Sequence, residues 1–552
     1  MAALIQFNAI HAKTKEQLRT LNLTSTPPPI QPHLSPYEPP FERDPKAFPQ
    51  DEESHDPDDD NNTPPYTSLP GISLQATNSG SHFYLVTWDS ASDPTNPRNW
   101  SLSKRLKVLF LLDLVAAVVT TASSIEAPVA PQSAAFFHAS ESVHAFCSTG
   151  IYLMGFGLGS LVAAPASEIL GRYQVYLYSL VTCECWLIGA ALAPNLASLA
   201  IFRFLAGCFA SAPMTVAGGS MSDLWSAREM TWTFPVFGVV GFGGPVLGPV
   251  IASYIGESKV VSWRWAEWII VVLTGVCILV VAVAMEETYP PQLLKLKAKQ
   301  LRKFTGDRRF KTAEEDEDEG LGSKLKKNFT RPFRLALEPI VVLLTFYNTL
   351  VYVVLFTFLV GYPYTFQKTY GMSQGLKNLC FLGLLVGILL SAALIPFIWT
   401  KTERLCREKG DDGSGKSIPQ ESRLMFAMFG APFIPIGLFW MGWTSYETIP
   451  VWSPLAASVV IGFGTVCIFM STYLYIIDSY QMYAASALSF QTTVRYVMAS
   501  VMTIGGTTMY RDIGTHWALT VLGCIAIVVT PVPYVLYRYG VIIRRKSKFA
   551  VR

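Results

Sequence analysis

Apolar runs separated by short polar joints fill the chain from Leu106 almost to its end. Each run holds about 20 residues, the length that a helix needs to cross a hydrocarbon core of about 30 Å. The runs lack the alternation of apolar and polar residues found in the strands of a membrane barrel. We therefore predict an all-α membrane protein with twelve transmembrane helices in two six-helix bundles, near 107–129, 143–163, 173–193, 199–221, 234–255, 266–285, 336–358, 378–398, 424–444, 453–476, 485–507 and 515–537.

The polar remainder of the chain divides into two tails and a central loop. The first 100 residues hold 15 of the 36 prolines and the acidic run DEESHDPDDDNN, a composition that cannot bury a core. The central loop contains PQLLKLKAKQLRKF, which predicts an amphipathic helix near the inner leaflet. We expect a disordered cytoplasmic tail at 1–100, bundles at 101–285 and 336–538, a cytoplasmic loop at 286–335 and a basic cytoplasmic tail at 539–552.

Charge is scarce and unevenly placed. Only 15% of the residues are charged and 51% are hydrophobic, which excludes the surface of a soluble enzyme. Lysine and arginine gather before the first span, in the central loop, in the joint at 399–423 and at the C-terminus, so the positive-inside rule predicts that both termini are cytoplasmic. The net charge of +3 does not indicate a nucleic-acid partner. We find no nucleophile-base arrangement and no metal-ligand cluster, and therefore expect no enzyme, no metal and no cofactor.

One nucleotide-binding pattern is rejected on its context. Residues 410–417, GDDGSGKS, satisfy the phosphate-binding pattern G-x-x-x-x-G-K-S. In ATP-binding proteins this loop follows a strand and opens a helix. Here no strand precedes it, and Ile418-Pro419 follows where the helix would begin. We expect a flexible loop between helices and no ATP.

The joint between spans two and three, GSLVAAPASEILGRY, combines glycine and proline with two opposite charges. Glycine lets the two helices turn tightly, and Glu168 and Arg172 could latch them at the inner membrane edge in one conformational state. The alternative is an ordinary tight loop whose arginine extends to the interface.

Span five repeats small residues at helical spacing. Gly238, Gly241, Gly244 and Gly248 lie three or four residues apart, and a proline follows each of the last two. Such spacing makes a smooth face for close helix packing, while proline removes backbone hydrogen bonds. The glycines alone predict a packing seam, and the repeated Gly-Pro pair favours a bend that matters to gating.

Ionisable residues inside apolar spans are costly and are functional candidates by default. Arg203 lies about one turn from the end of span four, where its side chain could also reach the interface. Arg495 and Glu184 lie deep in spans eleven and three, Asp113 is shallower in span one, and Glu126 and Asp478 lie near span ends. A buried carboxylate suits proton coupling, although each could instead be a structural hydrogen-bonding group.

Several segments together resemble the fungal drug:proton antiporters of the major facilitator superfamily. The resemblance covers most of the chain after residue 85 and includes WDSASDPTNPRNWS, GSLVAAPASEILGR, RFLAG, GFGGPVLGP, SWRWAEW and IIDSYQMYAASAL. It implies the superfamily's fold, alternating inward-open and outward-open states, and export of toxic organic compounds from the cytoplasm across the plasma membrane in exchange for protons.

The resemblance also implies roles for particular residues. The coupling arginine would be Arg203, while Asp113, Glu184 and Arg495 are further proton-coupling candidates because they lie inside the spans. The inner latch would be Gly159, Pro165, Glu168, Gly171 and Arg172, and the antiporter motif would be Gly241, Gly244, Pro245 and Gly248.

The expected partners are a small organic substrate, protons and the lipid bilayer, bound by a monomer. Six aromatic residues could line an apolar cavity, although such residues more often face lipid or the membrane interface: Tyr352, Phe356, Tyr362, Tyr364, Tyr473 and Tyr475. The alternatives are a polyamine exporter, a proton-coupled nutrient symporter and, from another class, a non-transporting membrane receptor or scaffold.

Overall fold

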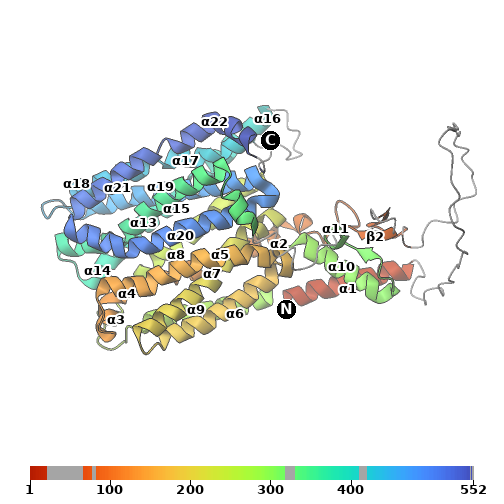
Figure 1. Cartoon of the computed structure of the whole chain (residues 1–552), viewed down its shortest axis with the longest axis horizontal. Coiled ribbons are helices and arrows are strands. Elements are labelled where there is room, and N and C mark those ends of the chain that lie inside the picture. The colour runs from red at the N-terminus through yellow and green to blue at the C-terminus, as the bar shows by residue number, and fades with distance from the viewer. Residues whose placement is uncertain are drawn as a thin grey trace, which may run out of the picture. The chain divides into compact units, whose positions relative to one another are not determined.

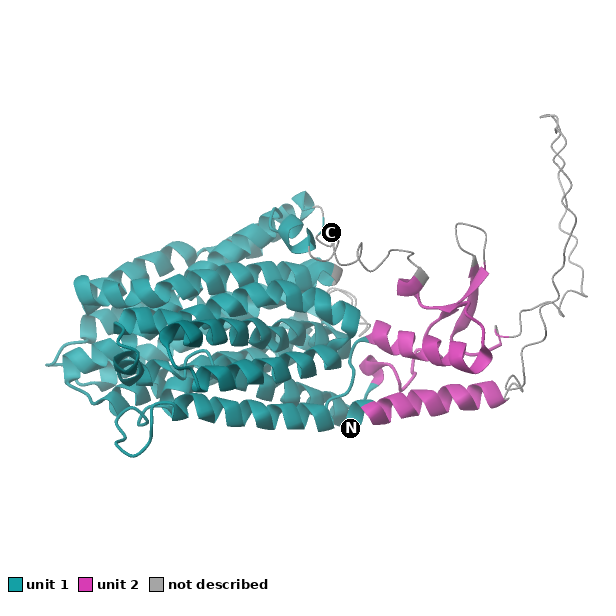
Figure 2. Ribbon diagram, turned by 60° about the horizontal axis from the view of Figure 1, so that its bottom comes forward, with its two compact units in different colours: residues 1–3, 100–289, 319–552 teal, residues 4–99, 290–318 magenta. Residues whose placement is uncertain are grey.

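The computed structural model describes residues 1–20, 66, 68–76, 82–316, 330–408, 419–547 and 549. Two compact units divide the chain, and Figure 2 colours them separately. Unit 1 holds residues 1–3, 100–289 and 319–552, and unit 2 holds residues 4–99 and 290–318. The pattern GDDGSGKS and most of the proline-rich and acidic stretch lie outside the described residues.

The first half of unit 1 contains six long helical segments, which run side by side in Figure 1. Short helix α3 (Ala130–Phe136) lies in the connection after the first of them, and the second is assembled from α4, a π-helical turn (Phe146–Gly150) and α5. The segments are α2 (Leu102–Thr121), α4 (Glu141–Ala145) with α5 (Ile151–Leu170), α6 (Arg172–Ala191), α7 (Leu196–Leu224), α8 (Met230–Ile251) and α9 (Trp265–Ala284).

The second half repeats the arrangement with six more segments, three of them broken into shorter helices. The segments are α13 (Pro339–Tyr370); α14 (Gln374–Leu379), α15 (Phe381–Ser391) and α16 (Leu394–Glu408); α17 (Met425–Gly430) and α18 (Phe433–Thr444); α19 (Trp452–Tyr480); α20 (Ala484–Asp512); and α21 (Thr515–Val529) with α22 (Val532–Lys546). Every predicted span overlaps one of these segments.

Nine of the segments are long and apolar enough to cross a membrane. The other three are α2, α6 and α20, which occupy the first, third and eleventh positions. Helix α2 begins with Lys104, Arg105 and Lys107 and carries Asp113, so charge rather than length sets it apart. The described residues therefore agree with the predicted all-α membrane protein of twelve helices in two bundles.

Glycines permit close packing within and between the helices. A Cβ added to Gly155 of α5 would lie 3.1 Å from the backbone nitrogen of Cys208 in α7 and would overlap the carbonyl of Phe204. Gly171, with φ of +94°, forms the turn between α5 and α6. Across the two halves, α5 packs on α20, and α8 packs on α15 and α19, so these helices form the interface between the bundles.

Unit 2 joins the N-terminal segment to the central loop around a small sheet. Strands β1 (Ile72–Ala76) and β2 (His82–Val86) are antiparallel, and β3 (Phe310–Lys311) adds in parallel to β2. Helices α1 (Ala2–Thr20), α10 (Pro290–Thr305) and α11 (Ala313–Asp316) complete it. Its buried apolar side chains come from both sequence segments, and the main ones are Leu18, Leu69, Ile72, Tyr84, Val86, Ala298, Leu301 and Phe310.

This unit differs from two expectations. Residues 2–20, 72–76 and 82–86 form regular elements within the stretch that we expected to be a disordered tail. The predicted amphipathic helix exists as α10, but Ala298 and Leu301 are buried in the core of unit 2 rather than free to face the inner leaflet. Neither the N-terminal segment nor the central loop has enough apolar residues to form a core alone, and the two segments form one together.

The C-terminal boundary also differs. Helix α22 continues to Lys546, so much of the segment predicted as a basic tail from residue 539 is helical. Arg544 is buried and ion-paired with Glu421 at 2.6 Å, which explains why the helix persists into a basic sequence.

Candidate functional site

Arg203 of α7 is the centre of a buried charged cluster in the first bundle. Its side chain is 1% exposed, its Nη2 lies 3.2 Å from Glu126 Oε2, and the same nitrogen is ion-paired with Glu267 of α9. Its Nη1 donates a hydrogen bond of 2.8 Å to the carbonyl oxygen of Ala122, just after α2. The arginine therefore does not extend to the membrane interface but holds three elements together.

The cluster contains more negative than positive charge. The side chains of Glu126 and Glu267 are 1% and 0% exposed, and with both ionised the three groups sum to one negative charge. Neither oxygen of Glu126 has a hydrogen-bond partner within the described residues, and neither does Oε2 of Glu267. Since an uncompensated buried charge costs several kcal/mol, this environment favours one bound proton.

His144 of α4 borders the same cluster. Its Nε2 lies 3.9 Å from Glu126 Oε1, its side chain is fully buried, and it is hydrogen-bonded to the hydroxyl of Ser133. A second group that can carry a proton therefore lies against the carboxylate that faces Arg203.

The other predicted intramembrane carboxylates lie elsewhere. Asp113 of α2 has one buried oxygen without a hydrogen-bond partner within the described residues, and so does Glu184 of α6. Glu184 faces α9 beside Gly275. Neither residue is among the ion pairs of Arg203 in the described chain, so the structure does not bring the predicted coupling residues into one cluster.

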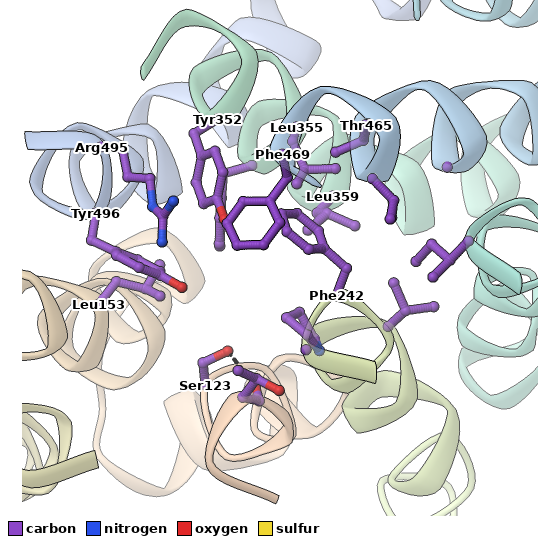
Figure 3. A pocket seen from close by; sticks show the side chains of 18 of the residues that line it. Ser123, Leu153, Phe242, Tyr352, Leu355, Leu359, Thr465, Phe469, Arg495 and Tyr496 are labelled. Atoms are coloured by element: carbon purple, nitrogen blue, oxygen red, sulfur yellow. Dashed lines mark hydrogen bonds between the residues drawn. The ribbon is translucent and has the colours of Figure 1, made fainter. Parts of the chain in front are cut away.

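Arg495 of α20 lies apart from this cluster, at a cavity between the two bundles that is here called the central cavity (Figure 3). The cavity measures about 40 Å³, and its wall is mostly aromatic and aliphatic. Arg495 is the one charged residue among the described residues that line it. Drug-sized ligands occupy pockets of about 300–1,000 Å³, so this packing of the helices is too closed to hold such a ligand.

A second cavity of about 210 Å³, here called the distal cavity, lies next to the central cavity and shares Pro245, Phe356 and Leu359 with it. Its other lining residues include Glu141 and Lys377, so it is more polar. The two cavities together mark a route along the interface between the bundles.

Polar contacts bridge the bundles at both ends of this interface. At the end where α2 begins, here called the proximal end, Arg228 is ion-paired with Glu403 and Arg423 Nη1 donates to Thr231 Oγ1 at 2.5 Å. At the opposite, distal end, the side chains of Gln132 and Gln374 are hydrogen-bonded at 2.8 Å. The two bundles are therefore joined by polar contacts at both ends of the interface.

The comparisons with known proteins identify the family. The family model for the Major Facilitator Superfamily matches residues 112–503. The chain belongs to this superfamily. It is a multi-pass membrane transporter, and the predicted fold is confirmed by its similarity to the proton:xylose symporter XylE, with a TM-score of 0.58 at 13% identity over 80% of this chain and 96% of that one.

Relatives of this superfamily member include transporters from several fungi. MFS-type transporter kojT of Aspergillus flavus is 42% identical over 488 residues, 87% of this chain and 86% of that protein. MFS-type efflux pump MFS2 of Trichophyton rubrum is 36% identical over 85% of this chain and 77% of its own length. The citrinin biosynthesis cluster MFS transporter mrr1 of Monascus ruber is 33% identical over 85% and 92%.

The residues that we predicted to form an inner latch lie in the first bundle of this superfamily member, in α5, α6 and the turn between them. Arg172 Nε is 3.2 Å from Asp223 Oδ2 at the end of α7. The backbone N–H of Arg172 donates a hydrogen bond of 3.0 Å to Glu287 Oε1. Glu168 interacts electrostatically with the same guanidinium. Asp223 is therefore an ion-pair partner of Arg172 in addition to Glu168, the opposite charge that we predicted. Gly159 and Pro165 lie in α5, and a Cβ at Gly159 would lie 2.6 Å from Ser211 Oγ.

Two glycines of the predicted antiporter motif pack on the first helix of this superfamily member. Added Cβ atoms at Gly244 and Gly248 of α8 would lie 2.9 Å from the carbonyl oxygens of Ala117 and Thr121 in α2, and would overlap nearby hydroxyls. Gly241 and Pro245 instead line the central cavity. Gly244 and Gly248 therefore form a packing seam against α2, as the glycine spacing predicts. Gly241 and Pro245 lie at the cavity, which is compatible with the predicted bend of α8.

The predicted aromatic residues separate into three groups. Tyr352 and Phe356 line the central cavity, and Tyr364 lines the distal one. Tyr473 lies beside Arg495, with the guanidinium 5.0 Å from its ring centroid. The remaining two, Tyr362 and Tyr475, are fully buried and line neither cavity.

Sequence reasoning missed Glu267 and placed Glu126 only at a span end. Glu267 lies in SWRWAEW, at the start of the apolar run 266–285. A carboxylate inside a predicted span was the available signal. Its pairing with Arg203 depends on the packing of α9 against other helices, which a single sequence does not give.

Proposed function

We propose that this transporter is a proton-coupled exporter of toxic organic compounds, such as antifungals or fungal secondary metabolites, and that it works by alternating access. The observation that carries the proposal is the buried cluster of Arg203, Glu126 and Glu267, where one cation faces two carboxylates. The names of two relatives, an efflux pump and a citrinin biosynthesis cluster transporter, support export and this class of cargo.

Protonation of one carboxylate changes how Arg203 is held. With Glu126 and Glu267 both ionised, the guanidinium is shared between them, and with one protonated it pairs with the other alone. Glu126 follows α2 and Glu267 lies in the first turn of α9. The choice of partner therefore alters the relative stability of two packings of these helices, which is what coupling requires.

Transport through the closed structure requires the two ends to open in turn. Opening the proximal end breaks the Arg228–Glu403 ion pair and the contact of Arg423 with Thr231, and opening the distal end breaks the Gln132–Gln374 contact. Pro245, at the cavity edge of the α8 seam, is our candidate for the bend that accompanies this change.

Asp113 and Glu184 remain candidates for further proton sites, because each has a buried oxygen without a hydrogen-bond partner within the described residues. An arginine stays protonated at any physiological pH. Arg203 and Arg495 therefore act by attracting carboxylates or other anions, not by releasing protons themselves.

The alternatives meet specific difficulties. A polyamine exporter needs carboxylates at its central cavity, whereas the charged residue that lines this cavity in the described chain is Arg495. A proton-coupled nutrient symporter fits the fold equally well, since the solved structure XylE is a symporter. The direction of substrate flux against an imposed proton gradient separates the symporter from the antiporter.

We further propose that the transporter resides in the plasma membrane as a monomer with both termini in the cytoplasm. The lysine and arginine residues in the first turns of α2 and in the last turn of α22 support this orientation. The proximal end of the bundles would then be cytoplasmic, because α2 begins there.

The test is transport by the purified full chain in inside-out proteoliposomes with an acidic interior. We expect citrinin and fluconazole, as two probes, to accumulate more than passive leak allows, and a protonophore to abolish accumulation. Arg203→Ala should lose gradient-driven accumulation, whereas Lys259→Gln, a change at an exposed position in the loop before α9, should not. Accumulation that survives collapse of the gradient contradicts the proposal.

A further inference from the structure

Arg495 lies in the middle of α20, is 2% exposed and is surrounded by aromatic rings. The guanidinium carbon lies 4.5 Å from the ring centroid of Tyr352, 4.9 Å from that of Tyr496, 5.0 Å from that of Tyr473 and 5.3 Å from that of Phe469. Figure 3 shows the side chain projecting from its helix toward the cavity between Tyr352 and Tyr496. These rings all come from helices α13, α19 and α20 of the second bundle, and the first bundle contributes Thr120, Leu153 and Phe242 to the same cavity, so the arginine lies where both bundles meet.

The charge of Arg495 has no carboxylate partner. No ion pair joins it to an acidic side chain within the described residues, whereas Arg172, Arg203 and Arg423 are all ion-paired. Its Nε and Nη1 atoms are buried without hydrogen-bond partners. The faces of the surrounding rings offset part of this cost through cation–π attraction, and the side chains of Tyr473 and Tyr496 interact with the guanidinium, but the N–H groups of Nε and Nη1 have no partner within the described residues.

The rest of the cavity offers few free donors. The hydroxyls of Thr120 and Ser123 donate 2.6 Å hydrogen bonds to the backbone carbonyls of Ala116 and Thr120, and Thr465 donates one of 2.9 Å to the carbonyl of Ile461. The guanidinium is therefore the strongest hydrogen-bond donor available at the cavity. A planar fork of N–H groups matches the two oxygens of a carboxylate.

We infer that this cavity binds small aromatic organic anions, and that Arg495 is the residue that recognises their carboxylate, phenolate or enolate group. The inference rests on the proposed transport function and specifies its cargo. The anion satisfies the N–H groups of Arg495, and its planar body stacks on Tyr352, Phe469 or Tyr496 after the cavity widens. A cation such as a polyamine is repelled by the same charge.

The competing explanation is that Arg495 only braces the aromatic rings. A brace needs the cation–π contacts but gives no preference among ligands of the same shape. The two explanations therefore differ in one measurable quantity, the ratio of affinities for an acid and for its neutral amide.

The experiment measures equilibrium binding to the purified full chain in detergent at pH 7.5, without any gradient. The probes are 1-naphthoate, 1-naphthamide and 1-naphthylmethylamine, which share one ring system and differ in charge. A hydrogen bond to a charged group corresponds to about tenfold to a hundredfold in affinity. We expect 1-naphthoate to bind about tenfold or more tightly than the amide, and the amine to bind most weakly.

Variants test whether Arg495 causes the preference for the acid over the amide. Arg495→Gln should bind the acid and the amide equally, Arg495→Lys should keep part of the preference, and Arg511→Gln, an exposed change on the same helix, should leave it intact. If Arg495→Gln does not fold, the wild-type ratio and the Lys variant decide. Equal or absent binding of acid and amide to the wild type, or an unchanged ratio in Arg495→Gln, overturns the inference.

The outcome is independent of the test of proton coupling. Anion preference with gradient-independent transport would keep the inference and contradict the proposed coupling. Gradient-driven export without anion preference would do the reverse.

Discussion

Nη2 of Arg203 lies 3.2 Å from Oε2 of Glu126, which joins the middle of the first bundle to the turn that follows its first helix. The same nitrogen is ion-paired with Glu267, so a single guanidinium connects α7 to two other parts of the bundle. All three side chains are at most 1% exposed. Any change in the charge of one of them must therefore be compensated by the other two rather than by water.

Removing one carboxylate should be tolerated by the fold, whereas removing both should not. In Glu267→Gln the arginine keeps Glu126, and the excess negative charge disappears. In Glu126→Gln/Glu267→Gln the arginine is left buried and uncompensated, which costs about 3–5 kcal/mol. We expect thermal unfolding of the purified protein to show a small change for each single variant and a large, more than additive loss for the double variant. Additive small losses would contradict the charge balance described above.

The glycines of α8 supply a second prediction with a matched control. A Cβ at Gly244 would lie 2.9 Å from the Ala117 carbonyl and overlap the Thr120 hydroxyl, whereas a Cβ at the neighbouring Gly243 would lie 3.8 Å from Leu385 Cδ1. Gly244→Ala should therefore separate α2 from α8 and destabilise the protein by about 1–3 kcal/mol. Gly243→Ala should be nearly neutral. Unfolding temperatures and transport rates of the two variants check this, and equal behaviour would contradict a tight seam at Gly244.

The spans and the seam could be predicted because their signals are local. The run predicted at 199–221 becomes α7 at Leu196–Leu224, since an apolar stretch in lipid must satisfy its own backbone by forming a helix. Likewise, the glycine spacing of α8 predicts a packing face, although it does not identify α2 as the helix that packs there.

Contacts between distant segments could not be predicted in this way. The core of unit 2 combines Leu18 of α1 with Leu301 of α10 and Phe310 of β3, and none of these segments has enough apolar residues alone. The same holds for the charged residues. Arg203 is recognisable as costly within a span, but its pairing with Glu267 requires two helices to be placed side by side.

The proximal ion pair between Arg228 of the first bundle and Glu403 of the second should control opening at that end. In Arg228→Glu two carboxylates repel across the interface, and we expect faster hydrogen exchange in residues 225–231. In Arg228→Glu/Glu403→Arg the pair is restored with reversed sign, and exchange should slow again. If the double variant exchanges as fast as the single one, the ion pair does not hold this end closed.

Unit 2 should lose stability in acid through Asp93. Burial alone would raise the pKa of its carboxyl group, but hydrogen bonds from Lys13 and Thr95 outweigh burial and lower the pKa from 3.8 to about 2. A lowered pKa means that the contribution is complete above about pH 4 and is lost as the pH falls toward 2. Hydrogen exchange of residues 82–99 should therefore accelerate over this range. Asp93→Asn should weaken that pH dependence, leaving the part due to Asp89, whose pKa burial alone would raise but Lys13 and Lys297 lower, and should exchange faster at neutral pH.

Lys13 and Lys15 of α1 provide a matched pair of variants that tests this site. Its Nζ lies 2.8 Å from Asp93 Oδ1 and 2.6 Å from Asp89 Oδ2, and Lys297 holds Asp89 from α10 at 2.6 Å. In Lys13→Met burial is opposed by fewer hydrogen bonds, so the pKa of Asp93 rises and the loss of protection begins at a higher pH. Lys15→Met, at an exposed position on the same helix, should leave the profile unchanged. Identical profiles for the two variants would contradict the role of Lys13, because only one of them removes a cation from the buried carboxylates.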